Sequence, residues 1–259
     1  MTQVYRWLNT HTGGFIAYPL PMNLALAGLS YGITLVALAL LAVRTKKLIG
    51  IYKKGQPDPT RSNDKAQRLR MAAGEIFGHT KMLNFTVVGF AHWFVMIGFF
   101  ALFGTLVTAY GQLINPKFAL PIIGHFWVYE YVTELITWAT GIGILTLIVI
   151  RQVTRLSNKR SRFAGSGMGK AYYVEFTILL IVFCVLALRG LEGALSDETS
   201  WNRHYITTWW LADFLKSMTL TELTNLIQTI AAIKIVASMT WFLSLIHISE
   251  PTRHLRNSY

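Results

Sequence analysis

Residues 24–43 read LALAGLSYGITLVALALLAV, a stretch of twenty residues without a single charged side chain. As an α-helix this stretch would be about 30 Å long, which matches the hydrocarbon thickness of a bilayer. The whole chain of 259 residues is 53% hydrophobic and only 14% charged, whereas soluble proteins carry roughly 25% charged residues. We therefore expect a polytopic membrane protein. A soluble enzyme, a disulfide-rich secreted domain and a disordered linker are excluded.

Four further apolar segments follow the first one, at residues 83–110, 131–150, 171–188 and 225–242. None of them alternates polar and apolar side chains, and backbone groups in lipid must be satisfied within their own segment. Each segment is therefore expected to cross the membrane as a helix. The predicted fold is an all-α membrane protein, in which residues 1–242 form a bundle of five transmembrane helices.

Basic residues are concentrated in two of the connections between these segments. Residues 44–82 hold ten Lys and Arg side chains and residues 151–170 hold six, out of 24 in the chain. Connections 111–130 and 190–224 hold only Lys117, Arg203 and Lys216. Because cytoplasmic loops are rich in Lys and Arg, we expect loops 44–82 and 151–170 in the cytoplasm and the N-terminus outside. The net charge of +12 then belongs to these loops, and no nucleic-acid partner is expected.

Two histidines belong to the second segment. His92 lies nine residues after Leu83, about 14 Å into the membrane, and its imidazole could ligate a haem iron or make an interhelical hydrogen bond. The small side chains of Gly89 and Ala91 would let a flat macrocycle approach the backbone. His79 lies thirteen residues before His92, an offset of about 140° on a straight helix, so spacing alone does not support two stacked haems.

Ionisable side chains inside membrane spans are costly, and each is a functional candidate. Glu175, near the inner end of the fourth segment, and Glu134, near the outer end of the third, suit proton transfer to or from a quinone. Arg189 could pair with a haem propionate. The alternative for Arg189 and for Lys234 is snorkelling to the outer surface.

Other polar residues limit the kinds of cofactor and reaction that this chain could support. His125 and His204 both fall at the outer side, where they could share a ligand or belong to an aromatic belt. The single cysteine, Cys184, cannot form an iron–sulfur cluster or a zinc site, so redox chemistry in this chain needs another cofactor. The sequence has no HExxH motif and no clustered histidine boxes, which leaves hydrolase and desaturase interpretations without support.

Five spans and a second span carrying His79 and His92 resemble the nitrate reductase gamma-subunit type of cytochrome b. Three stretches are more closely similar to the membrane domain of actinobacterial heterodisulfide-reductase-related iron–sulfur oxidoreductases, which include proteins proposed to link electron-transfer flavoprotein to menaquinone. They are FGHTKMLNFTVVGFAHWFVMIGF at 77–99, SRFAGSGMGKAYYVEFTILLIVFCVLALRG at 161–190 and IKIVASMTWF at 233–242.

This resemblance implies an oxidoreductase domain in a bacterial plasma membrane that passes electrons between a cytoplasmic iron–sulfur module and menaquinone through b-type haem. His92 and His79 are the implied haem ligands, and the iron–sulfur clusters are expected in a following cytoplasmic part, with electron-transfer flavoprotein or a similar donor as partner. The first alternative is a haem-free membrane anchor that shapes a quinone site. The second is a small proton-coupled transporter using Glu134, Glu175 and Lys234.

The last residues have a different character. Residues 243–253 read LSLIHISEPTR, which is the translation of a transposase-end sequencing adapter. We expect residues 243–259 to be an artefact of sequence assembly and this fragment to be inactive alone. Because residues 243–246 are mostly apolar, the fifth helix is expected to continue through them, and His247 and His254 are given no role.

Overall fold

The computed structural model describes residues 23–55, 63–78, 80–84, 86–156, 168–198 and 200–248, and these are helical apart from short connections. The long helices are α2 (Leu24–Tyr52), α7 (Trp127–Leu156), α8 (Met168–Leu195) and α10 (Leu220–Ile248). The shorter ones are α3 (Lys65–Gly78), α4 (Thr80–Leu83), α5 (Thr86–Ala101), α6 (Phe103–Ile114) and α9 (Trp209–Leu215). No strand occurs in the described part of the chain, so the predicted all-α fold is confirmed.

Four of these helices are long and apolar enough to cross a membrane: α2, α7, α8 and α10. The second predicted span is broken into α5 and α6, which meet at a 42° bend and make a fifth span if counted together. The break lies at Leu102, whose carbonyl accepts from Thr105 N at 3.0 Å in a tight turn. The chain is thus an all-α, multi-pass membrane protein with four or five spans.

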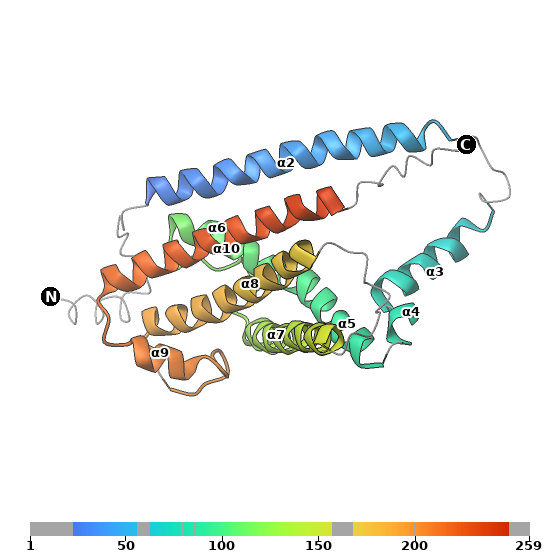
Figure 1. Ribbon diagram of the computed structural model, residues 1–259. Helices are drawn as coiled ribbons and strands as arrows, with labels where there is room; N and C mark the ends of the chain where they lie inside the picture. The colour runs from blue at the N-terminus through green and yellow to red at the C-terminus, as the bar shows by residue number, and fades with distance from the viewer. Residues whose placement is uncertain are drawn as a thin grey trace.

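The bundle is arranged around α10, which packs against α2, α6 and α8, while α5 packs mainly against α7 (Figure 1). Small side chains such as Ala231 and Ala232 are buried in α10 and let neighbouring helices approach closely. The larger core residues Ile227 and Ile235 of α10 have no exposed surface and pack among Leu106 and Leu113 of α6 and Leu188 and Leu191 of α8.

Several helices extend beyond the predicted segments. The fourth segment continues as α8 to Leu195, so Glu192 belongs to the helix and not to a loop. The connection 190–224 also contains α9 and the start of α10. At its other end α10 runs through residues 243–246 to Ile248. The continuation of α10 through residues 243–246 confirms the prediction made from their apolar side chains. The extension of α8 to Leu195 lies outside the apolar window and packs against α9.

The two ends of the bundle differ in their content of Lys and Arg side chains. Among the described residues, the low-charge end contains residues 111–130, 190–198 and 200–224, and the basic end contains residues 44–55, 63–78, 80–82, 151–156 and 168–170 (Figure 1). In Figure 1 the low-charge end is on the left, where α2 and α10 begin and α8 ends.

Candidate functional site: a buried ionic cluster and its cavity

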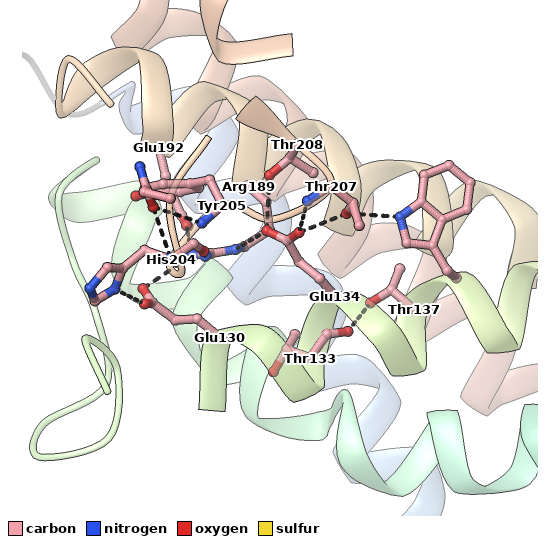
Figure 2. Close-up of polar contacts among 12 residues, drawn as sticks. Glu130, Thr133, Glu134, Thr137, Arg189, Glu192, His204, Tyr205, Thr207 and Thr208 are labelled. Atoms are coloured by element: carbon pink, nitrogen blue, oxygen red, sulfur yellow. Dashed lines mark hydrogen bonds and ion pairs between the residues drawn. The ribbon is translucent and has the colours of Figure 1, made fainter. Parts of the chain in front are cut away.

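The low-charge end holds a group of ionisable residues, here called the Arg189 cluster: Glu130 and Glu134 of α7, Arg189 and Glu192 of α8, and His204 (Figure 2). The two glutamates of α7 lie one turn apart, and so do Arg189 and Glu192, because residues three or four apart share a helix face. The 200–208 segment folds over both helices and contributes the histidine.

The guanidinium of Arg189 is at the centre of this cluster and is only 8% exposed. Its Nη1 lies 2.8 Å from Glu192 Oε2 and 3.3 Å from Glu130 Oε1, and its Nε lies 3.5 Å from Glu134 Oε1. Its Nη2 donates to the carbonyl oxygen of His204. Arg189 therefore does not snorkel to the surface, because protein oxygens surround its guanidinium, although its Nε has no hydrogen-bond partner. The pairing of Arg189 with a haem propionate stays a prediction.

Glu134 fixes the loop that covers the cluster. Its Oε2 accepts from Thr207 N at 2.8 Å and from Thr207 Oγ1 at 2.7 Å, and its Oε1 accepts from Thr208 Oγ1 at 2.9 Å. Glu134 is 1% exposed. Glu134, the predicted proton-handling residue of the third segment, thus uses both carboxylate oxygens to hold residues 207–208 against α7.

Glu130 is paired with an imidazole. Nδ1 of His204 lies 2.5 Å from Glu130 Oε2. The cluster contains three carboxyl groups around one guanidinium, and His204 is the second basic side chain within ion-pair distance of it. The guanidinium carbon of Arg189 lies over the ring of Tyr205, 4.6 Å from the ring centroid. Burial raises the pKa of the Tyr205 phenol, so this side chain is neutral.

A cavity of about 260 Å³ opens beside the Arg189 cluster. It is lined by α6, α7, α8 and α10 together with the 115–126 connection, and His125 and Lys234 are both among its lining residues. The structure therefore brings His125 and His204 to the same end of the bundle: His125 lines the cavity together with Glu130, and His204 contacts the carboxylate of Glu130.

Glu175 belongs to the basic end, where it is 5% exposed on α8. Its Oε1 lies 2.6 Å from Nε of Arg151, while its Oε2 is buried without a hydrogen-bond partner. Tyr172, one turn earlier, bonds to Gln152 and Arg155 of α7. The two predicted proton-handling carboxylates thus lie at opposite ends of the bundle and have different surroundings.

His92 lies on α5 with an exposed side chain, and His79 is outside the described residues. The small residues beside His92 serve helix packing. A Cβ at Gly89 would lie 2.0 Å from the carbonyl oxygen of Met82, and Ala91 is 6% exposed, with its carbonyl oxygen against Gly143 of α7. The expected room for a macrocycle is therefore taken up at these positions by α4 and α7.

A second, apolar cavity of about 80 Å³ lies between α5, α7, α8 and α10, lined by Phe99 and Trp241 among others. Phe99 follows His92 by two helical turns on one face of α5. The cavity is far smaller than the roughly 300–1,000 Å³ typical of ligand pockets. Of the two implied haem ligands the structure describes only His92, and this apolar cavity beside its helix is too small to enclose a haem.

Sequence reasoning missed several members of this site. Glu192 falls in a predicted connection, yet it follows Arg189 by three residues, the spacing of a helical ion pair. His204 is predicted at the outer side, but its contact with Glu130 is not. Gln112, whose Nε2 donates to Glu192 Oε1 at 2.5 Å, had no recognisable pattern. Its role depends on the packing of α6 against α8 and α10, which no local signal encodes.

The fold and these buried charges define an all-α, multi-pass membrane protein with an ionic cluster and a polar cavity inside its bundle. Compared with known proteins, the chain has no match: no protein family, no curated protein and no solved structure matches it.

Proposed function

We propose that this chain is the membrane domain of an oxidoreductase and passes electrons between a cytoplasmic iron–sulfur module and menaquinone. In this proposal the basic end lies in the cytoplasm of a bacterium and the N-terminus lies outside, as the distribution of Lys and Arg favours. The sequence resemblance of residues 77–99, 161–190 and 233–242 supports the same assignment.

The observation that carries the proposal is the buried carboxylate of Glu175 at the basic end. Reduction of a quinone to a quinol consumes two electrons and two protons, so a quinone-linked domain needs proton donors within the membrane. Glu175 lies inside α8 with one oxygen bound to Arg151 and the other unpaired. A buried polar atom without a partner is costly and is typical of a functional site.

Haem, when bound, supplies a one-electron carrier between clusters and quinone, and His92 would ligate its iron, with His79 as the second candidate ligand. The two imidazoles would not bind the same iron, because thirteen residues correspond to about 20 Å along a helix. The described residues contribute only the first of these imidazoles.

The test is a reduced-minus-oxidised spectrum of the full chain, purified from bacterial membranes, with haem measured as pyridine haemochrome. We expect a b-type α-band that is lost in His92→Ala and retained in the matched control His125→Ala, because His125 belongs to the cavity at the opposite end. A spectrum unchanged by His92→Ala would show that His92 is a packing residue.

A haem-free anchor that shapes a quinone site is the second candidate. It is favoured by the packing around His92, since Gly89 and Ala91 are covered by protein. Absence of any b-type band in the wild-type chain would support this candidate. In that case, binding of a menaquinone analogue that is weakened by Glu175→Gln would retain the quinone assignment, and no binding would end it.

A further inference from the structure

Lys234 is a buried cation in the middle of the bundle. It lies fourteen residues after the start of α10, about 21 Å along the helix, and is 2% exposed. Its Nζ donates to the carbonyl oxygen and to Oγ1 of Thr105, both at 2.8 Å. No carboxylate among the described residues lies within ion-pair distance of it. Lys234 does not snorkel, because its ammonium points into α6 and not toward a surface.

An ammonium at this depth in a membrane protein is expensive, and such a group normally serves a function. Two oxygens of one threonine compensate a charge less well than a carboxylate does. Lysine also has three donors, of which Thr105 engages two.

The cavity of about 260 Å³ leads from Lys234 to the low-charge end. One wall is a face of α6 formed by Thr105, Thr108 and Gln112, whose spacings of three and four residues place them in a row. Two lining residues of the 115–126 connection, Lys117 and His125, are exposed, and we infer that the mouth of the cavity lies beside them. A continuous polar face thus connects a buried amine with a solvent-accessible opening.

Two buried oxygens along this route have no partner in the protein, Gln112 Oε1 and Tyr129 Oη. Both residues line the cavity. Buried polar atoms normally have hydrogen-bond partners, and water is the partner that a small polar cavity most readily supplies. At about 30 Å³ per molecule, the cavity has room for several waters.

We propose that this cavity is a hydrated half-channel through which Lys234 exchanges a proton with the low-charge side of the membrane. In the forward step the ammonium of Lys234 gives one proton to cavity water and keeps the bonding electron pair as an amine. The reverse step restores the ammonium. The proposal rests on the cavity and does not depend on haem or quinone.

The groups that face Lys234 are few in the described part of the chain. From α8, Glu192 and Cys184 are the ionisable groups whose field reaches its amine. From α7, Tyr129 and Glu130 line the same cavity, while α6 contributes only uncharged polar groups. Arg189, at the far side of the cavity, is surrounded by carboxylates.

Cysteine accessibility tests the channel in a Cys184→Ala chain embedded in oriented membrane vesicles. Lys234→Cys is compared with Ile233→Cys, whose position is 43% exposed on the outside of the bundle and faces lipid. A membrane-impermeant cationic methanethiosulfonate, added at the low-charge side, should modify Lys234→Cys about tenfold faster or more, because only a hydrated thiol ionises and reacts. Thr108→Phe, which fills the middle of the route, should abolish the difference.

Equal rates at the two positions, or modification of Lys234→Cys only from the basic end, would overturn the half-channel. Proton exchange is measured separately by nitrogen NMR of side-chain-labelled lysine in the otherwise wild-type chain, with Lys234→Arg identifying the signal. A Lys234 signal that titrates and that Thr108→Phe shifts or broadens supports the proposal. A signal unchanged between neutral and alkaline pH contradicts it. Loss of haem or quinone binding would leave both measurements unaffected.

Discussion

Arg189 shows how a single side chain can stabilise the contact between two helices of a membrane bundle. The guanidinium pairs with Glu130, Glu134 and Glu192, which belong to two helices; Glu134 is fully buried and has no other cationic side chain within ion-pair distance among the described residues. A planar guanidinium can serve three acceptors at once, which the single ammonium of lysine does less well. The residue therefore links α7 to α8 through electrostatics as well as packing.

Replacing Arg189 by Gln should destabilise the protein by about 3 to 5 kcal/mol, because the carboxylates would remain buried without their partner. Arg189→Lys should recover only part of this loss. Thermal unfolding of the purified protein in detergent measures the effect. The matched control is Lys216→Gln, which breaks an exposed pair with Asp213 and should change stability by no more than about 1 kcal/mol. Equal effects of the two substitutions would show that the Arg189 cluster is not a stabilising centre.

At the scale of elements, the contact between α5 and α7 depends on glycine. A Cβ at Gly98 would lie 1.9 Å from Oγ1 of Thr140, and a Cβ at Gly143 would lie 2.8 Å from the carbonyl oxygen of Ala91. The two helices therefore approach closely because neither position carries a side chain. This approach also positions His92, which follows Ala91 on the same turn of α5.

Gly98→Ala should destabilise the protein by about 1 to 3 kcal/mol, since the new methyl group forces α5 away from α7. Thr140→Ala removes the clashing oxygen, so the double variant should be more stable than the sum of the two single changes predicts. Unfolding of the four proteins in a double-mutant cycle measures this coupling. Strict additivity would mean that the two helices adjust without contact at this position.

The elements were predictable to different degrees. Uninterrupted apolar runs such as 24–43 indicate a spanning helix because lipid leaves the backbone no other partner. Four of the five segments lie within single helices of the structure, and the second contains α5 and α6 on either side of a bend. The bend at Leu102 was not predictable, since the sequence there contains no proline and remains apolar on both sides. The Arg189 cluster was predictable only in part, because Glu130, Glu134 and Arg189 share an end, whereas their contact with His204 depends on how the 200–208 segment folds.

For the whole molecule, the charged side chains are distributed asymmetrically between the two ends of the bundle. The basic end contains exposed Lys and Arg side chains, whereas the low-charge end carries the mouth of the cavity and the Arg189 cluster. If the basic end faces the cytoplasm, the buried carboxylate of Glu175 can exchange protons with the cytoplasm and Lys234 with the outside. Orientation therefore decides what each of these groups could contribute to a proton-coupled reaction.

Orientation is tested with single cysteines in a Cys184→Ala chain in intact bacterial cells. Lys53→Cys and Lys170→Cys report on the two basic connections, and Ser196→Cys and Lys216→Cys report on the low-charge end; all four positions are exposed. Because cytoplasmic loops carry the excess of Lys and Arg, an impermeant maleimide should label only the latter pair, and a permeant maleimide should label all four. Labelling of Lys53→Cys and Lys170→Cys by the impermeant reagent would invert the topology. Lys234 would then exchange protons with the cytoplasm, while the half-channel itself would remain, since its route depends on the bundle and not on the side that the bundle faces.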